Sequence, residues 1–93
     1  MKNRSRMEIS AAILELAQGG AIKTRIMYEA ILSFDQVQKY FELLIDLGLM
    51  EYDKEERKYH TTEKGKRFVK AYREMEGLFH PSRITKKMNK NEK

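Results

Sequence analysis

The apolar residues of this chain recur at steps of three and four positions in four stretches, a spacing that gathers them on one face of an α-helix. We therefore predict helices over residues 6–18, 25–31, 34–47 and 63–79. The densest stripe belongs to the third helix, whose core-facing positions are expected to be Val37, Tyr40, Phe41, Leu44 and Leu47. The second helix is expected to bury Ile26, Met27, Ala30 and Ile31.

The residues that flank these stretches are suited to begin and end helices. A side-chain oxygen at the first position can accept a hydrogen bond from the free N–H groups of the first turn, and the residues expected in this role are Ser5, Thr24, Ser33 and Thr62. Gln36 follows Ser33 by three positions, and Glu8 follows Ser5 likewise, which is the spacing of a capping box. Glycine is expected to end the first and third helices, and His80-Pro81 the fourth.

Two short runs after Gly48 are typical of β-strands. Residues 49–52 and 58–61 are the extended candidates, and the polar run between them is expected to turn. Such a hairpin makes Tyr52 and Tyr59 cross-strand neighbours. Ala21 and Ile22, between the first two helices, suit a short strand or a bridge. The predicted order is α-β-α-α-β-β-α, a mainly α fold with a small β-hairpin, which is the architecture of a winged helix-turn-helix.

The net charge of +5 is unevenly distributed. Residues 1–7 hold three basic residues and no acidic one, residues 80–93 hold five basic residues and one acidic, and residues 8–79 hold eleven basic and thirteen acidic. The length allows one domain. We predict a basic N-terminal flank over residues 1–7, a winged helix-turn-helix domain over 8–80 and a basic, flexible tail over 81–93. Basic flanks suit contact with nucleic-acid phosphates, and they equally suit a solubilising role.

The sequence contains no motif of catalysis or metal binding. It has no cysteine, which excludes disulfides and thiolate metal sites and favours an intracellular protein. His60 and His80 fall on different elements without metal-ligand spacing, and no glycine-rich phosphate loop occurs. No apolar run is long enough for a membrane helix or for a signal peptide. We predict a cytoplasmic protein that is not an enzyme and uses neither a cofactor nor a metal.

The start of the third helix carries the candidates for reading DNA. A helix fits the major groove, and its N-terminal residues reach base edges. The candidates for base contact are Asp35, Gln36, Gln38 and Lys39, because glutamine can pair with adenine, lysine with guanine and aspartate with cytosine. The alternative is that they are ordinary solvated helix residues. Glu42 and Asp46 would repel phosphate, so only the first two turns are expected to approach DNA.

Two further groups are candidates for contact with the DNA backbone. The first surrounds the start of the second helix and the turn after it, and comprises Lys23, Thr24, Arg25, Tyr28 and Ser33. The second lies on the wing and comprises Lys54, Arg57 and Lys58. Because the wing also carries Asp53, Glu55 and Glu56, it is near neutral and equally suits a purely solvated hairpin.

The last predicted helix has an apolar stripe with coiled-coil spacing, formed by Phe68, Tyr72, Met75 and Phe79. It can pack within the monomer or against a second copy. A chain this small does not bury every aromatic side chain alone, so we predict a homodimer through this helix. A two-fold dimer places two recognition helices about 34 Å apart, one turn of the duplex.

Several motifs in the chain also resemble a known family. They are Gly20-Ala21-x-Lys23-Thr24-Arg25-Ile26-Met27-Tyr28-x-Ala30, Leu32-Ser33, Gln38-Lys39-Tyr40, Leu43-Leu44, Gly48-Leu49 and Thr62-Glu63-Lys64-Gly65. Over residues 8–76 the chain resembles the small archaeal winged-helix transcriptional regulators, a group that includes abundant ten-kilodalton chromatin-associated dimers. The resemblance implies a cytoplasmic, nucleoid-associated, dimeric DNA-binding protein without enzymatic activity. Gly77 and Pro81 depart from the long last helix of the chromatin-type members.

Three functions are consistent with these features. The leading hypothesis is a transcriptional regulator that reads duplex DNA with the third helix in the major groove. The near-neutral middle of the chain, with Glu42 and Asp46 exposed, also suits a protein–protein interaction module of a transcription complex. The basic ends suit a non-specific chromatin architectural protein.

Overall fold

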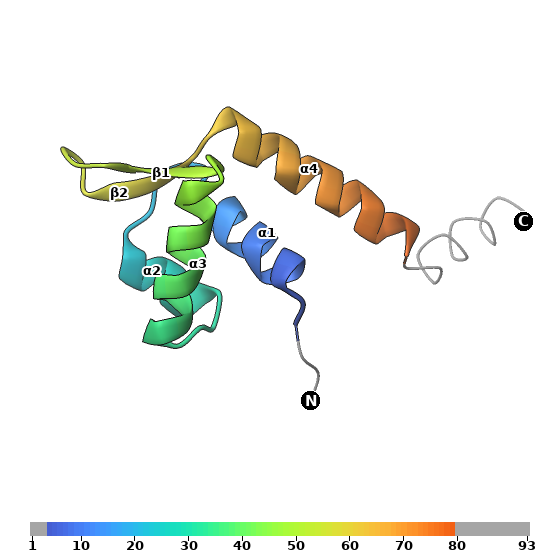
Figure 1. Ribbon diagram of the computed structural model, residues 1–93, viewed down its shortest axis with the longest axis horizontal. Helices are drawn as coiled ribbons and strands as arrows, with labels where there is room; N and C mark the ends of the chain where they lie inside the picture. Colours follow the sequence, from blue (N-terminus) through green and yellow to red (C-terminus); the bar gives the residue numbers. More distant parts are fainter. Residues whose placement is uncertain (1–3, 80–93) are drawn as a thin grey trace, which may run out of the picture.

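The computed structural model of the protein describes residues 4–79, in which four helices and one hairpin follow one another in the predicted order. In chain order the elements are α1 (Arg6–Leu16), α2 (Lys23–Glu29), α3 (Phe34–Asp46), β1 (Met50–Asp53), β2 (Lys58–Thr61) and α4 (Glu63–Leu78). Figure 1 shows the hairpin reaching out on the α2 side of α3, while α4 runs away on the α1 side. The predicted winged helix-turn-helix architecture is confirmed.

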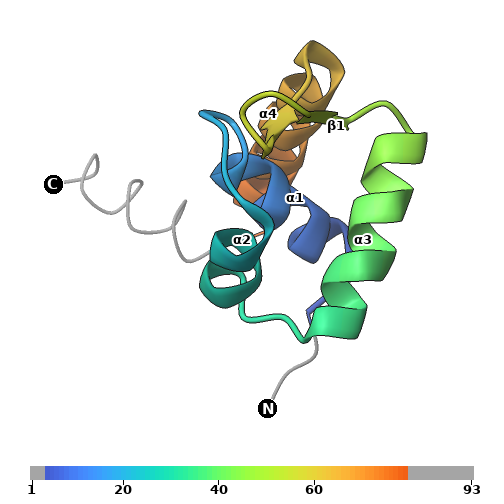
Figure 2. The same ribbon diagram turned by 90° about the vertical axis from the view of Figure 1, so that its left-hand side faces the viewer.

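The apolar stripes of the first three helices meet in one core. Figure 2 shows α1 between α2 and α3. The side chains buried most completely in this region are Ile13, Leu14, Ile26, Val37 and Leu44. Met50 of β1 and Val69 of α4 belong to the same cluster, so the hairpin and the last helix close over the three-helix core.

Leu47 is the exception in the predicted stripe of α3. Its side chain is 48% exposed, and Leu47 is the C-cap of α3, one residue past the end of the helix at Asp46. The prediction that Leu47 faces the core is therefore wrong. Tyr40 is only partly buried and packs at the edge of the core.

The hairpin is joined to the helices by backbone and ring contacts. β1 and β2 pair antiparallel with Tyr52 opposite Tyr59, as predicted, and the centres of these two rings are 4.7 Å apart. Ala21 forms a bridge with Tyr59 through hydrogen bonds of 3.0 and 2.8 Å. The Tyr59 ring also lies 4.6 Å from that of Phe41 in α3. Burial raises the pKa of Tyr59, and the nearby Tyr52 raises it further.

Three of the four predicted helix caps are confirmed. The Ser5 hydroxyl accepts a hydrogen bond from the Glu8 N–H, and the Thr62 hydroxyl accepts one from the Gly65 N–H. Ser33 and Gln36 form the complete capping box, in which each side chain accepts from the other residue's N–H at 3.1 and 2.9 Å. Such a cap contributes about 1 kcal/mol to helix stability.

The fourth predicted cap, Thr24, is wrong. α2 begins at Lys23 with Ile22 at its N-cap, and no side chain accepts a hydrogen bond there. The bridge between Ala21 and Tyr59 explains the shift, because it leaves Ile22 alone in an extended conformation before the helix starts. Thr24 consequently lies inside the first turn of α2.

α2 also ends earlier than predicted, at Glu29. The Leu32 N–H donates to the Met27 carbonyl at 3.0 Å and the Ile31 N–H to that of Tyr28 at 3.2 Å, which is a Schellman motif. Ile31 holds the left-handed position with φ of 56°, where α3 has Gly48 with φ of 76°. This conformation turns the Ile31 side chain outward, leaving it 78% exposed, so the prediction that Ile31 is buried is wrong.

Arg4 lies within the predicted basic flank and supports this turn. Its Nη2 atom donates to the carbonyls of Ala30 and Ile31 at 2.7 and 3.1 Å. A left-handed conformation costs a non-glycine residue about 1–2 kcal/mol, and the two charge-assisted hydrogen bonds offset part of that cost.

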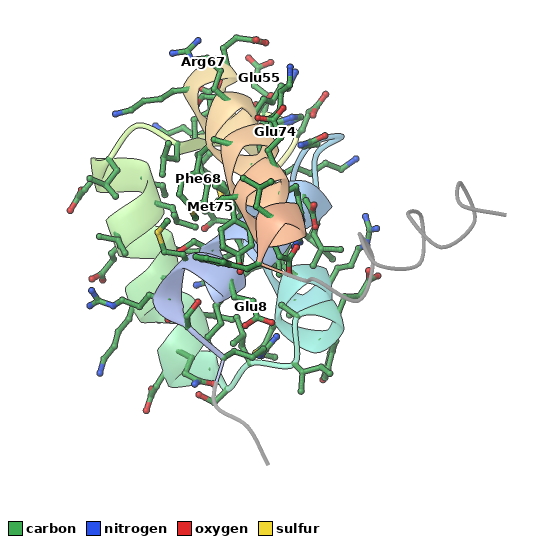
Figure 3. All side chains as sticks on the ribbon, turned by 90° about the vertical axis from the view of Figure 1, so that its right-hand side faces the viewer. Glu8, Glu55, Arg67, Phe68, Glu74 and Met75 are labelled. Carbon is green, nitrogen blue, oxygen red and sulfur yellow. The ribbon has the colours of Figure 1, made fainter. Side chains whose placement is uncertain are left out.

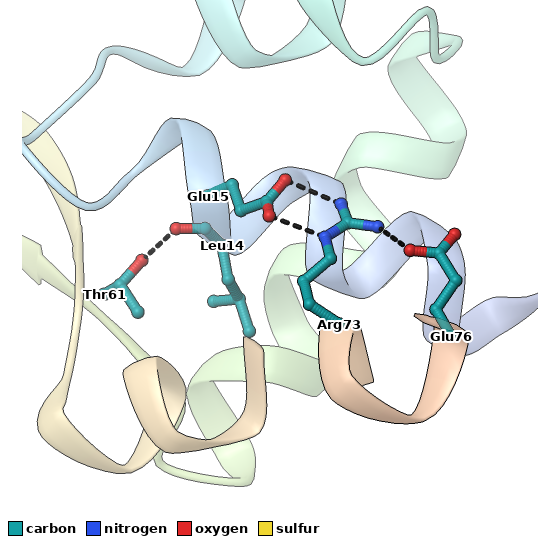
Figure 4. Close-up of polar contacts among 5 residues, drawn as sticks. All are labelled: Leu14, Glu15, Thr61, Arg73 and Glu76. Atoms are coloured by element: carbon teal, nitrogen blue, oxygen red, sulfur yellow. Dashed lines mark hydrogen bonds and ion pairs between the residues drawn. The ribbon is translucent and has the colours of Figure 1, made fainter. Parts of the chain in front are cut away.

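Polar contacts join α1 both to the end of β2 and to α4, as Figure 4 shows. The buried Thr61 hydroxyl donates to the Leu14 carbonyl at 2.6 Å. On α4, the Arg73 guanidinium donates to both Glu15 carboxylate oxygens at 2.7 Å and to Glu76 at 2.8 Å. α4 ends at Leu78 with Phe79 as C-cap; the predicted stop at His80-Pro81 and the predicted tail lie outside the described residues.

Gly65 permits the close approach of α4 to the end of α3. A Cβ atom at Gly65 would lie 2.1 Å from the Leu49 carbonyl oxygen and 2.6 Å from the Thr61 Cγ2 atom. Lys64 and Thr62 reinforce the junction by donating to the carbonyls of Leu47 and Gly48 at 2.7 and 2.6 Å.

The two glycines of α4 are therefore expected to respond oppositely to the same substitution. Gly65→Ala drives a methyl group into backbone and should lower the free energy of unfolding by about 2–3 kcal/mol. Gly77→Ala adds a Cβ with no atom within 4 Å and should raise it by about 0.5–1 kcal/mol, because alanine favours the helix. Urea unfolding of both variants measures the difference. Equal effects of the two substitutions would contradict the close packing at Gly65.

The contact between Glu15 and Arg73 is expected to make stability depend on pH. The hydrogen bonds from Arg73 lower the pKa of Glu15 below 4.5, although partial burial opposes the shift. The carboxylate therefore stabilises the fold above its unfolded pKa, and this contribution is lost as the pH falls through the lower folded value. Because Glu15 is 41% exposed, Glu15→Gln should cost only about 0.5–1 kcal/mol at neutral pH.

The measurement is thermal unfolding at neutral pH and at a pH well below 4.5. The difference between wild type and Glu15→Gln should disappear in acid, where both side chains are uncharged. Glu74→Gln, which removes an exposed carboxylate from the turn of α4 that carries Arg73 (Figure 3), is the matched control and should have little effect at either pH. A Glu15→Gln cost that stays constant with pH would contradict the assignment.

Candidate nucleic-acid interface

The first two turns of α3 present a polar face to solvent. Val37, Phe41 and Leu44 are buried on the inner side of the helix. A turn of 100° per residue puts Asp35 and Lys39 on the opposite side, and both are exposed. Of the four predicted base-contact residues, these two have positions that point directly away from the core.

Gln36 is exposed but its side chain already takes part in the capping box. Its Oε1 atom accepts the Ser33 N–H at 2.9 Å, and the Ser33 hydroxyl accepts the Gln36 N–H. Contact of either side chain with DNA would therefore compete with the cap or use the Gln36 amide nitrogen alone. The cap sets the starting point and direction of α3, which is a structural contribution to the interface.

Gln38 is half-buried, and its side chain accepts a hydrogen bond from a residue of α2. Lys23 Nζ, at the start of α2, donates to Gln38 Oε1 and lies 5.4 Å from the centre of the Phe34 ring. We call these three side chains the Lys23–Phe34–Gln38 group. Lys23, predicted to hold phosphate, is thus partly occupied by a contact between α2 and α3.

The other predicted backbone contacts on α2 are exposed. Arg25 Nε donates to Glu29 at 2.9 Å, and both side chains are about half exposed. Thr24 is exposed in the first turn, and Tyr28 is 75% exposed in the last. Since an exposed ion pair contributes little, an incoming phosphate could draw Arg25 away from Glu29 at small cost.

The basic residues of the wing, Lys54, Arg57 and Lys58, are all exposed as an external contact would require. The turn that carries them is held by Asp53, whose Oδ1 atom accepts the N–H groups of Glu55 and Glu56 at 2.9 and 3.2 Å. Arg57 closes the turn with φ of 58°. The wing tip is therefore ordered by an acidic residue, and its charge is close to balanced.

The hairpin also gathers three residues that the sequence spacing did not associate. His60 Nε2 lies 3.2 Å from Glu56 Oε1, and one ligand atom from each of Asp53, Glu56 and His60 falls within 4.8 Å of the others. The chain reversal between β1 and β2 brings them together. Hydrogen bonding within the turn accounts for this arrangement.

The C-terminal half of α3 is acidic, as predicted. Glu42 and Asp46 line a hollow between α3, the start of α2 and the hairpin, together with Lys23, Gln38 and Tyr59. Both carboxylates repel phosphate. Any duplex that meets this surface is therefore favoured at the N-terminal end of α3 and disfavoured toward its C-terminal end.

Sequence reasoning missed an apolar rim around the turn between α2 and α3. Tyr28, Ile31 and Phe34 are 75, 78 and 62% exposed. Phe34 could have been noticed, because it is the first helical residue inside the Ser33–Gln36 capping box and lies outside the buried stripe. Ile31 could not, because its exposure follows from a left-handed backbone conformation.

The predicted dimer stripe of α4 divides into an inner and an outer part. Phe68 and Tyr72 are half-buried, with ring centres 6.5 Å apart, and Phe68 packs against the core. Met75 and Phe79 are 41 and 75% exposed. Figure 3 shows Phe68 and Met75 along the same side of α4, so the apolar stripe continues from the core to the exposed end.

Comparison with known proteins identifies the class of this fold. The chain matches the winged helix-turn-helix family over residues 3–79, and it therefore belongs to that family. It is 38% identical over 73 residues to an uncharacterized protein of Methanocaldococcus jannaschii, a match that covers 77% of this chain and 73% of the relative.

Among solved structures, the chain is similar to Sso10a-2, described as a DNA-binding protein from Sulfolobus solfataricus. The TM-score is 0.77 at 27% identity, and the match covers 95% of each chain. The predicted resemblance to archaeal winged helix-turn-helix DNA-binding proteins is thereby confirmed. Within residues 4–79, no helix has the length and apolarity needed to cross a membrane.

Proposed function

We propose that this protein binds double-stranded DNA, with the first two turns of α3 in the major groove, and that it has no enzymatic activity. The observation that carries the proposal is the exposed start of α3, which the capping box directs outward with Lys39 opposite the buried face. The similarity to Sso10a-2, a DNA-binding protein, supports it. Lys39 donates to a base edge, and Asp35 limits which base can lie beside it.

The backbone contacts come from both flanks of α3. Arg25 exchanges Glu29 for a phosphate, while Lys54, Arg57 and Lys58 hold the duplex weakly from the wing. Glu42 and Asp46 stop the duplex short of the end of α3. Because positive charge near α3 is limited, the basic residues outside 8–79 supply much of the electrostatic attraction.

We further propose a role in transcription regulation, in a cytoplasmic protein associated with the nucleoid. Selective binding to a few sites would support that role, whereas uniform coating of DNA would favour the architectural alternative. The acidic end of α3 would favour the protein-interaction alternative if no duplex bound. Selection of bound sequences from random duplexes at two salt concentrations distinguishes these three functions.

Binding is expected to weaken steeply as salt rises, because each phosphate contact releases a counterion. Arg25→Ala should weaken all duplexes alike and reduce the slope of log affinity against log salt by about one phosphate contact. Glu29→Gln, which frees Arg25, should strengthen all duplexes alike. Lys39→Ala should instead lower discrimination between selected and random duplexes by about 1–3 kcal/mol.

Fluorescence anisotropy with one selected and one random duplex measures the affinities of the wild type and of the three variants. Affinity that does not change with salt, or no binding to either duplex, would overturn the proposal. A loss of discrimination in Arg25→Ala equal to that in Lys39→Ala would contradict the division into backbone and base contacts.

The proposed active form is a homodimer through α4. An apolar hollow between α1, α3 and α4, lined in part by Met7, Leu43, Leu47 and Phe68, adjoins the exposed stripe that ends at Phe79. A second copy would cover this surface, whose removal from water favours association.

The double variant Met75→Asp/Phe79→Asp should therefore be monomeric at concentrations where the wild type is dimeric, because two buried carboxylates oppose the interface. Sedimentation equilibrium over a range of concentrations checks this. Ile31→Asp, which changes an equally exposed apolar residue on the far side of the domain, is the control and should leave the dimer intact. A monomeric wild type would rule out the proposed dimer.

A further inference from the structure

Phe34 is an exposed aromatic residue that the fold does not require. It is 62% exposed, whereas Leu32 and Val37 on either side of it are buried and fix the entry of the chain into α3. An exposed phenylalanine at the first position of a helix gains nothing from the capping box, which uses only Ser33 and Gln36. Its ring therefore offers an apolar surface beside the polar start of α3.

Gln38 lies one helical turn farther along, where positions four apart share a face of the helix. Lysine has only donors, so the Gln38 atom that meets Lys23 Nζ must be the carbonyl oxygen, and the assignment of the amide is settled by chemistry. The Gln38 amide nitrogen is left as the group that can meet DNA. It can donate and cannot accept.

Lys23 also fixes the position of the aromatic ring. Its Nζ atom lies 5.4 Å from the centre of the Phe34 ring, within the range of a cation–π contact. The Lys23 ammonium thus contacts both the Phe34 ring and the Gln38 carbonyl oxygen, which orients the amide nitrogen. Little side-chain freedom therefore remains to be lost on binding. The group has the order that recognition of a single base would need.

We propose that the Lys23–Phe34–Gln38 group recognises the major-groove edge of thymine. Thymine presents there an acceptor, O4, next to the C5 methyl group. The Gln38 amide nitrogen donates to O4, and the Phe34 ring covers the methyl group. The inference rests on the proposed binding of α3 in the major groove, and it adds the base that this part of the surface selects.

The other three bases fit the group less well. Cytosine presents a donor, N4, which would face the Gln38 donor, and it has no methyl group. Guanine offers only acceptors and adenine an acceptor with a donor, so both leave the Phe34 ring without an apolar partner. The methyl group is therefore the feature that the test must isolate.

The test compares an alternating adenine–thymine duplex with the same duplex carrying uracil at every thymine position. Uracil keeps O4 and base pairing and lacks only the methyl group. The wild type should bind the thymine duplex about fourfold more tightly for each protomer, which corresponds to about 0.8 kcal/mol for one methyl group removed from water. Phe34→Ala should bind the two duplexes equally.

Two further variants separate the roles within the group. Gln38→Ala should weaken binding to both duplexes, because both carry O4, and should keep the preference for thymine. Tyr28→Ala, which removes an aromatic residue exposed nearby on α2, should also keep that preference. Thermal unfolding of each variant confirms that the fold is retained, as expected for an exposed Phe34.

Equal affinity of the wild type for the thymine and uracil duplexes would overturn the inference while leaving DNA binding intact. A thymine preference that persists in Phe34→Ala would also overturn it, because the methyl group would then be read elsewhere. Failure to bind either duplex would also overturn the inference, whereas the proposed function falls only if the selected and random duplexes are left unbound as well.

Discussion

The arrangement of this domain depends on the close approach of α4 to the end of α3. Gly65 has no side chain where a Cβ would strike the Leu49 carbonyl, and Thr62 and Lys64 donate to the last carbonyls of α3 and its turn. This junction closes the hairpin over the core and brings Thr61 to the Leu14 carbonyl. The motif Thr62-Glu63-Lys64-Gly65 therefore holds the start of α4 against the end of α3. This contact explains how a motif outside α3 contributes to the position of α3.

Several side chains of the candidate interface already have partners within the protein. Lys23 with Gln38, Arg25 with Glu29 and Ser33 with Gln36 are all paired. The exposed pairs can exchange partners cheaply, since surface ion pairs contribute little. The capping box cannot be broken without disturbing the start of α3. The proposed phosphate contacts can therefore adapt, while the helix start proposed to read bases keeps a fixed orientation.

The turn between α2 and α3 contains a local strain that the fold tolerates. Ile31 occupies a left-handed position normally suited to glycine, and Arg4 binds the carbonyls around it. The result is an apolar rim of Tyr28, Ile31 and Phe34 next to the polar face of α3. Apolar groups near base edges add selectivity through thymine methyl groups, whereas the charges around them add affinity without selectivity.

Local sequence determined much of this protein: helical periodicity, the Ser33–Gln36 capping box, the pairing of Tyr52 with Tyr59 and the exposure of Asp35 and Lys39 follow from interactions a few residues apart. Tertiary structure decided the rest. The bridge from Ala21 to Tyr59 moved the start of α2, and Arg4 binds the carbonyls of Ala30 and Ile31 where the helix ends early. Lys23 met Gln38 and Phe34 only because α2 packs against α3. Such contacts join residues distant in sequence, so no local pattern records them.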